Sequence, residues 1–532
     1  MKGTDIYRQP CMPHNKKSAV NHDVSDMVMS PLVGSLNVSF IAINRFFVST
    51  AIAVFFLFYS VIIVLPGSSL LKDPDTLWHI RTGQWILDNA QFPVVDFYSY
   101  TAAGRRWIAG EWLSEILFAT AFKIGHWRGV VILSAITIAA IVATLSFYLL
   151  RNLRFSVAIG WTALTAFAIS PHFLARPHLF SFLLLLIWLI ILIDAYDSGD
   201  FRPSIFILAI LMVLWANLHG SFTLGAVVLC VFSFYYCCEK FFERNYIRCR
   251  DVFLMLLAVA VAALLTPYGI FSALVTLELF SMKFPLQRIA EWKSPDFQVF
   301  QPLLFLLVGL FAAITGLGIR LRGPRLILFS MMMFLGLSHL RGLLMFFLVA
   351  PIILARPIAS YSVWWRATRV VDSNSSGSTS APDPVVSYFQ GRPIMMPAIC
   401  LAMAALATAY SWGYSNSGPD ESKAPKAAID FVRQSKISGN VFNSYDFGGY
   451  LIFSAIPTFV DGRVAPYTDD FLRKYADAVN LVDINKAFLL LDDYKVTWVI
   501  LHPIEPLAKA LAQSALWHNA YSDKYAVVFV RR

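Results

Sequence analysis

Long apolar runs, separated by short polar segments, follow one another along most of the chain. About eleven runs can be counted, and several are shorter than the ~20 residues that a straight transmembrane helix needs. They cover residues 46–66, 128–150, 156–170, 179–196, 204–218, 221–238, 252–267, 301–319, 326–338, 342–355 and 396–413. The pattern predicts a mainly α-helical, polytopic membrane bundle of about eleven transmembrane helices, with a long first outer loop that carries surface helices.

Polar stretches divide this bundle from the rest of the chain. Residues 1–45 are polar and too long for a cleavable signal peptide, so we expect a cytoplasmic N-terminal tail. The main transmembrane domain then covers 46–355. A serine-rich segment at 356–395 predicts a flexible cytoplasmic linker, and the last transmembrane helix is expected at 396–413.

The final segment, 414–532, alternates helical with strand-like patterns. Helices are expected at 426–434, 469–480 and 506–514, and strands at 441–442, 458–460, 496–501 and 525–530. This alternation predicts a small soluble α/β domain. The pairs Gly448-Gly449 and Asp461-Gly462 follow expected strands, where tight turns are their common use and a part in a site at the strand ends is the alternative.

The composition agrees with a membrane protein. Of 532 residues, 58% are apolar and 14% are charged, whereas about 25% are charged in soluble proteins. This excludes a disordered chain, a coiled coil and an ordinary cytosolic enzyme. The net charge of +10 lies in the apolar part, because residues 419–532 contain 13 basic and 13 acidic residues. Membrane orientation explains such an excess, and nucleic acid is not expected as a partner.

The distribution of charge also predicts the orientation. With the N-terminus inside, the inner segments carry 19 basic and 11 acidic residues, and the outer segments carry 11 and 9. This follows the positive-inside rule. An odd number of spans then places the final domain outside. The cysteines agree with this orientation, because none of the six lies in a predicted outer loop or in the final domain. We expect an integral protein of a bacterial inner (plasma) membrane with a periplasmic, extracytoplasmic C-terminal domain.

The outer loop at 67–127 is the most informative segment. It is too amphipathic to span a membrane and too aromatic for a plain linker, so it should lie on the membrane surface. Asp75, which follows Asp73, precedes a helical pattern that includes Trp78. Asp75 can be a helix cap. It can also share one helix face with His79, four residues further on, as part of a polar site.

At these residues the sequence resembles the GT-C superfamily of polytopic glycosyltransferases, especially protein O-mannosyltransferases and lipid A aminoarabinose transferase. Asp75 matches the aspartate of the family's Asp-Glu signature, and His79 matches the later aromatic position. Thr76 replaces the usual glutamate. The segment with Glu111 and Trp112 resembles the family's second surface helix. The likeness covers the layout of the main transmembrane domain.

The resemblance implies an inverting transfer of a sugar from a polyprenyl phosphate to an acceptor hydroxyl at the outer face of the membrane. Asp75 would be the general base, with Asp73 as the alternative, and cationic side chains would stabilise the departing phosphate. The acceptor would be a glycan, a lipid or a protein, and membrane lipids would surround the chain. A divalent cation, Mg2+ or Mn2+, stays open as a cofactor.

Several ionisable residues lie at the predicted outer ends of the spans, where each costs ~2.5–3.5 kcal/mol on insertion scales. Taken singly, each can be an interfacial residue that reaches water. Together they would suit a phosphate head group, since arginine makes forked contacts with it. The set consists of Arg176, His178, His219, His339 and Arg341, and Glu111, Trp112, His79 and Glu291 join it as substrate-binding candidates. The histidines come from separate loops without a short metal spacing, so no metal site is expected.

Two other functions stay open. A lipid-linked polysaccharide polymerase or ligase also uses arginine and histidine at the outer face. A non-catalytic assembly protein with the same fold fits the replacement of the signature glutamate by Thr76. A transporter is not favoured, because the interiors of the apolar runs are almost free of charge and show no paired repeat.

Overall fold

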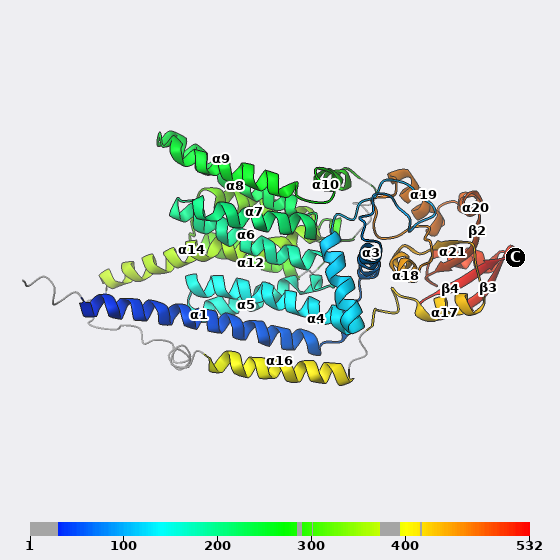
Figure 1. Cartoon of the computed structure of the whole chain (residues 1–532), viewed down its shortest axis with the longest axis horizontal. Helices are drawn as coiled ribbons and strands as arrows, with labels where there is room; N and C mark the ends of the chain where they lie inside the picture. The colour runs from blue at the N-terminus through cyan, green and yellow to red at the C-terminus, as the bar shows by residue number, and fades with distance from the viewer. Residues whose placement is uncertain (1–29, 283, 285–289, 300–301, 373–393, 415–417) are drawn as a thin grey trace, which may run out of the picture.

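Helices form most of the molecule in the computed structural model, which describes residues 30–282, 284, 290–299, 302–372, 394–414 and 418–532. Long helices lie side by side in one bundle, with a smaller domain at one end (Figure 1). The bundle contains α1 (Ser30–Val64), α4 (Trp112–Asn152), α5 (Phe155–Ile169), α6 (His178–Ser198), α7 (Arg202–Leu218), α8 (Phe222–Phe242), α9 (Tyr246–Ala263), α12 (Pro302–Gly316), α13 (Pro324–Ser338), α14 (Leu340–Asp372) and α16 (Met395–Tyr414). Each apolar run of the sequence falls largely on one of these helices, which confirms the mainly α, polytopic fold.

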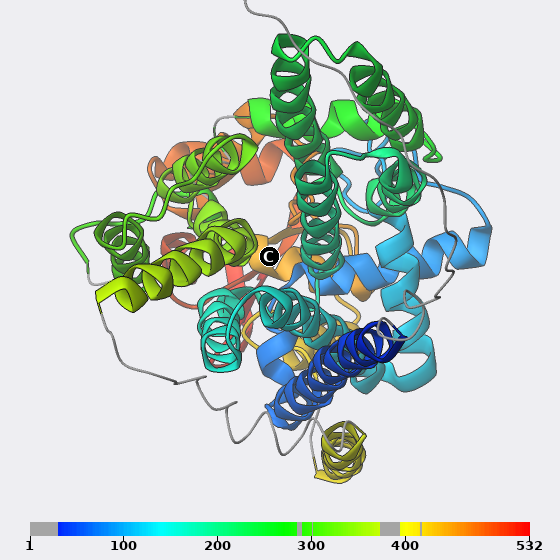
Figure 2. The same ribbon diagram turned by 90° about the vertical axis from the view of Figure 1, so that its left-hand side faces the viewer.

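Six helices among the described residues are long and apolar enough to cross a membrane: α1, α4, α6, α8, α14 and α16. Three shorter apolar helices, α7, α12 and α13, belong to the same bundle (Figure 2). The chain is therefore that of an integral membrane protein. The count of about eleven spans and the orientation in the membrane stay predictions.

Two helices extend past the expected domain boundaries. α1 begins at Ser30, inside the stretch 1–45 that we expected as a polar tail. α14 continues to Asp372, inside the stretch 356–395 that we expected as a linker. The rest of both stretches, apart from 394–395, lies outside the described residues.

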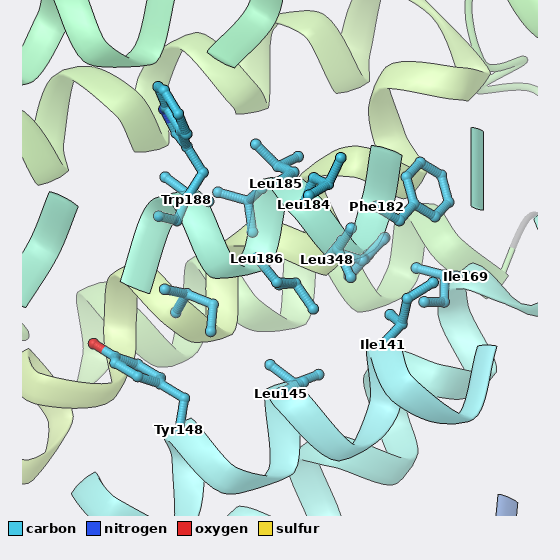
Figure 3. Close-up of a cluster of buried hydrophobic side chains, with 14 of the residues drawn as sticks. Ile141, Leu145, Tyr148, Ile169, Phe182, Leu184, Leu185, Leu186, Trp188 and Leu348 are labelled. Carbon is cyan, nitrogen blue, oxygen red and sulfur yellow. The ribbon is translucent and has the colours of Figure 1, made fainter. Parts of the chain in front are cut away.

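Aliphatic and aromatic side chains fill the interior of the bundle. Figure 3 shows Leu145 of α4, Leu185 of α6 and Leu348 of α14 in one buried cluster. Between helices in lipid, close packing rather than removal from water supplies the attraction. Large apolar side chains such as Phe206 and Phe253 are instead exposed on the outside, as expected where lipid covers them. α16 lies at the periphery, beside α1 (Figure 2).

The first outer loop covers the end of the bundle. After α2 (Gly67–Leu70), helix α3 (Asp75–Asn89) runs across the bundle axis and packs on the beginning of α4 (Figure 1). The backbones approach closely at Gly83, where an added Cβ would lie 2.0 Å from the Glu115 carbonyl oxygen. Non-helical backbone at Gly125 and His126 bends α4 between this part and the part inside the bundle.

Three shorter elements complete this end. They are η1 (Ser170–His172) before α6, α10 (Phe271–Ser281) after α9, and η2 (Ala290–Trp292) ahead of α12.

The terminal domain is the predicted α/β unit. Its described residues contain a four-stranded sheet in the order β1-β2-β4-β3, with β1 and β2 parallel and the other pairs antiparallel. The strands are β1 (Asn440–Asn443), β2 (Val496–Leu501), β3 (Trp517–Ser522) and β4 (Val527–Arg531). The helices are α17 (Lys426–Gln434), η3 (Tyr445–Phe447), α18 (Gly448–Phe453), α19 (Asp469–Val479), α20 (Ile484–Asp493) and α21 (Pro506–Gln513).

One expected strand of this domain is wrong. Residues 458–460 do not join the described sheet; Thr458 instead forms an isolated bridge with Ser99 of the first outer loop. The Tyr100 N–H donates to the Thr458 carbonyl at 3.2 Å, and the Thr458 N–H donates to the Tyr98 carbonyl at 3.0 Å. The segment has strand-like residues because it pairs with a loop 359 positions earlier.

Replacement of Gly83 by alanine tests the close packing of α3 on α4. The added methyl group has no space beside the Glu115 backbone, and such overpacking costs about 1–3 kcal/mol. We expect a lower melting temperature for the Gly83→Ala protein in detergent. Gly160→Ala in α5 is the control, because an added Cβ meets nothing within 4 Å there. Equal melting temperatures for the two variants would contradict this packing.

Candidate active site

One guanidinium joins the two carboxylates of the Asp73-Pro74-Asp75 motif. Arg176 lies just before α6, while Asp75 begins α3. Arg176 Nη1 donates to Asp73 Oδ2 at 3.0 Å, and Nη2 donates to Asp75 Oδ2 at 2.5 Å. The three side chains are 10–21% exposed, so water screens these charge-assisted bonds only in part. The motif and the loop before α6 are therefore held as one unit.

The helix-cap role considered for Asp75 is wrong. The residue at the N-cap position is Pro74, whose side chain makes no capping hydrogen bond. Asp73 Oδ1 accepts the Asp75 N–H at 2.8 Å, and Asp75 Oδ1 accepts the Trp78 indole N–H at 3.0 Å. The two carboxylate oxygens of Asp75 thus accept from the Trp78 indole and the Arg176 guanidinium, and not from the helix backbone.

The charged cluster continues to η2 and the beginning of α14. Glu291 lies between two arginines, with Oε1 3.7 Å from Arg176 Nη1 and Oε2 3.7 Å from Arg341 Nη1. Arg341 also lies over Trp292, 5.9 Å from the ring centroid. His339 forms a hydrogen bond with the Trp292 carbonyl at 2.8 Å. His339 thus supports the loop, whereas Glu291 and Arg341 belong to the charged cluster.

A chain of histidines and glutamates runs beside this cluster. His79 Nδ1 lies 3.3 Å from Glu115 Oε1, and His79 Nε2 lies 3.6 Å from Glu111 Oε2. Glu111 Oε1 lies 3.2 Å from His219 Nε2, and His219 Nδ1 is hydrogen-bonded to the Ser221 hydroxyl at 2.8 Å. The structure therefore brings together His79, Glu111 and His219, three of the substrate-binding candidates of the sequence.

Two buried histidines, His172 and His178, flank Arg176 in the sequence. His178 Nε2 donates to the His172 carbonyl at 2.8 Å, and the two rings are 5.7 Å apart. The His172 Nε2 and His178 Nδ1 atoms are buried without a hydrogen-bond partner. Buried polar atoms are rarely left unpaired, so these two nitrogens suit a ligand with oxygen atoms or hydroxyl groups. Burial lowers the pKa of His172 to about 4, and Arg341 and Arg176 act in the same direction.

Burial controls the protonation of the site. It raises the pKa of Asp75 to about 7, against the opposing effect of Arg176. Burial likewise raises the pKa of Glu111 to about 7. Although burial opposes it, Arg176 and Arg341 hold the pKa of Glu291 below its usual value. Burial lowers the pKa of His219 to about 3, so this ring is neutral near pH 7. The site therefore combines an ionised Glu291 with carboxyl groups that titrate near neutrality.

The terminal domain contacts the motif directly. A Cβ added to Gly462 would lie 2.0 Å from Asp75 Oδ1, and one added to Gly449 would lie 2.1 Å from the Pro74 carbonyl oxygen. Gly449 and Gly462 thus do more than form tight turns, because the absence of a side chain at each allows the terminal domain to approach the first outer loop.

Two results were not expected from the sequence. Trp112 donates to the Asn217 side chain at 2.7 Å and packs against Phe92, so it supports the chain of histidines from outside the charged cluster. His172 and Glu115, by contrast, belong to the site and were not predicted. His172 lies four residues before Arg176, and Glu115 lies four residues after Glu111, so helical spacing was the signal that could have found Glu115.

The geometry does not suit a divalent cation at the aspartates. The Arg176 guanidinium occupies the space between Asp73 and Asp75, and Trp78 holds the other Asp75 oxygen. Among the described residues, no group of three His, Cys, Asp or Glu side chains is arranged to hold a metal ion. Binding of Mg2+ or Mn2+ at these carboxylates would require Arg176 to leave.

Solved structures of two other proteins are similar to this chain. The oligosaccharyltransferase of Archaeoglobus fulgidus, tethered with an acceptor peptide containing the NVT sequon, gives a TM-score of 0.51 at 12% identity over 85% of this chain and 68% of the other. ArnT from Cupriavidus metallidurans in the apo state gives 0.49 at 14% identity over 94% and 98%. ArnT bound to undecaprenyl phosphate gives 0.46 at 14% identity over 91% and 97%. No protein-family model and no curated protein matches the sequence.

The likeness to the oligosaccharyltransferase shows that this chain shares the fold of that protein. This likeness confirms the fold that we expected from the residues around Asp75 and Glu111. At 12% identity it shows the fold alone.

Replacement of Arg176 by methionine tests whether its ion pairs hold the site. Loss of one partner leaves Asp73, Asp75 and Glu291 with uncompensated charge in a mostly buried place, which costs about 3–5 kcal/mol. We expect this loss in the free energy of unfolding, measured by titration with SDS in mixed micelles. Arg202→Met is the control, because Arg202 is 60% exposed in its pair with Asp251, where water screens the charges, and its loss should cost far less. Similar costs for both variants would contradict the structural role of Arg176.

Proposed function

We propose that this protein is a glycosyltransferase that moves a sugar from a polyprenyl phosphate to an acceptor hydroxyl at the outer face of the membrane, with inversion at the anomeric carbon. One observation carries the proposal: a mostly buried carboxyl group, Asp75, lies in a cluster of arginines at the end of an apolar helix bundle. A base and a cationic phosphate site side by side are what this reaction needs.

Arg176 and Arg341 supply the cationic side of the proposed site. Both are forked donors suited to phosphate oxygens, and Glu291 lies between them. The unpartnered Nε2 of His172 and Nδ1 of His178 add two positions for hydrogen bonds. A lipid-linked donor would reach these groups from the apolar surface of the bundle, with its sugar toward the first outer loop.

Asp75 takes the proton in this proposal. The acceptor oxygen attacks the anomeric carbon, the bond from that carbon to the phosphate oxygen breaks, and the acceptor proton goes to Asp75. The polyprenyl phosphate leaves with the electron pair of the broken bond. Arg176 now occupies Asp75 Oδ2, so a bound phosphate that attracts the guanidinium would free the base. Donor binding and activation of Asp75 are coupled through this one side chain.

The acceptor class stays open between a glycan, a lipid and a protein. A lipid-linked polysaccharide polymerase or ligase would use the same cluster on a different acceptor. A specific observation also favours the non-catalytic alternative, since both Asp75 oxygens already have partners and Gly462 covers one of them. In an enzyme, Arg176 must leave Asp75 and bind the phosphate of the donor. In a non-catalytic assembly protein, Arg176 would stay on Asp75.

Asp75→Asn tests the assignment of the base. The amide keeps the shape and accepts no proton, so we expect transfer of labelled sugar from polyprenyl phosphate donors in membranes to fall about 10²- to 10⁴-fold. Asp88→Asn is the matched control, because Asp88 lies exposed near the end of the same helix. Full transfer by the Asp75→Asn protein would refute the mechanism. Analysis of the glycan missing from a deletion strain would identify the donor sugar and the acceptor.

The pH dependence of transfer provides a second test. Asp75 acts as a base only when ionised, and its pKa is raised to about 7, so kcat/KM should fall about tenfold per pH unit as the pH drops below about 7. Glu111 titrates in the same range, so Glu111→Gln must be measured as well. The acidic limb should persist in that variant. A limb that disappears with Glu111 would assign the proton transfer to Glu111.

A further inference from the structure

The terminal domain reaches the Asp73-Pro74-Asp75 motif through two glycines. Gly462 faces Asp75 Oδ1 and Gly449 faces the Pro74 carbonyl, both so closely that a methyl group would collide with these atoms. Close approach of two backbones or of a backbone and a carboxylate is a reason for glycine at such positions. The segment 461–463 thus forms one wall around Asp75.

A buried ion-pair network fixes this wall from both sides. Arg463 Nη1 donates to Asp96 Oδ1 of the first outer loop at 2.6 Å, and Arg463 Nη2 donates to Asp461 Oδ2 at 2.7 Å. The Tyr467 hydroxyl donates to Asp461 Oδ2 at 2.7 Å. The side chains of Asp96, Arg463 and Asp461 are 0% exposed. Gly462 lies between the two locked residues of the terminal domain.

Aromatic rings and backbone groups complete the network. The Arg463 guanidinium lies 5.0 Å from the ring centroid of Tyr98 and 4.7 Å from that of Trp107, within the range of cation–π contacts. Asp96 Oδ1 also accepts the Tyr98 N–H at 3.0 Å. The Arg463 N–H donates to Asp461 Oδ1 at 3.1 Å, which closes the turn around Gly462. These buried charges are fully paired, and removal of one partner from such a pair is costly.

We propose that segment 461–463 is a wall of the active site, and that Arg463 is a positioning residue that holds Gly462 on Asp75 through its ion pair with Asp96. The inference rests on the proposed function, because it gives the terminal domain a part in the reaction of Asp75. The domain would exclude water from the base and limit the directions from which an acceptor hydroxyl can approach. An isolated membrane bundle would lack a complete site.

The wall contributes to the burial of Asp75. Burial raises the pKa of this group, and part of that burial comes from Gly462. The other groups that act on Asp75 belong to other segments. They are Asp73, Arg176, Glu111, Glu291, the Trp78 indole and the Tyr445 hydroxyl. A wall that moves away while these groups stay in place should therefore hydrate Asp75 and lower its pKa.

Carbodiimide labelling of the full-length protein in detergent tests the proposal without any sugar donor. Carbodiimide with glycine ethyl ester modifies protonated, accessible carboxyl groups, and peptide mass spectrometry gives the rate at each residue. In the Asp96→Asn and Gly462→Ala proteins we expect Asp75 to react about tenfold faster at its low-pH plateau, with its titration midpoint lowered by about one pH unit. The labelling of Asp88 should stay unchanged.

Two comparisons keep the outcome clear. Arg531→Met removes an ion pair with Asp492 elsewhere in the terminal domain and should leave Asp75 labelling at the wild-type rate. Gly462→Ala keeps every ion pair of the network, so wild-type labelling of Asp75 in this variant overturns the proposal even if Asp96→Asn labels faster through partial unfolding. Failure of the proposed function would be seen separately, as sugar transfer retained by Asp75→Asn.

Discussion

The pairing of buried charge at Arg176 is the constraint on which the domain-bearing end of the helix bundle depends. Two aspartates and a glutamate face this one guanidinium, and none of these groups can stay ionised away from water without a partner. The first outer loop, the turn before α6 and the loop before α12 must therefore meet at one place. The packing of the apolar bundle determines how far apart these loops begin, and the ion pairs of Arg176 determine how the loops lie against one another.

Close backbone approach is the second requirement. Gly83 brings α3 onto α4, and Gly449 and Gly462 bring the terminal domain onto the motif. A side chain at any of these positions would separate elements that carry charged residues of the site. Because the interior is closely packed, such a displacement would move those residues as a group. Close packing and charge pairing therefore both determine the positions of the residues around Asp75.

The sequence predicted the bundle and the α/β domain, because long apolar runs and alternating patterns are strong local signals. Isolated charges at the ends of the runs singled out most of the residues that the structure brings together around Arg176, whose part in a reaction stays a prediction. The sequence did not predict the partners. Arg176 was expected near phosphate, yet its 2.5 Å contact with Asp75 depends on how distant loops fold together. The segment 458–460 was read as a strand of the terminal sheet because strand-like residues do not reveal which partner they pair with. The ion pair between Arg463 and Asp96 could not be predicted, because two residues so far apart in the chain have no characteristic spacing that would mark them as partners.

The replacement of the signature glutamate by Thr76 is consistent with this electrostatic balance. The Thr76 side chain is buried, and its hydroxyl donates to the Ala175 carbonyl at 2.8 Å, one residue before Arg176. It therefore ties α3 to the loop that supplies the guanidinium. A glutamate at this position would add another buried negative charge to a cluster in which acidic groups already outnumber the arginines, at a large desolvation cost. The threonine keeps the connection between the two segments and avoids that charge, so its presence does not by itself argue against a base at Asp75.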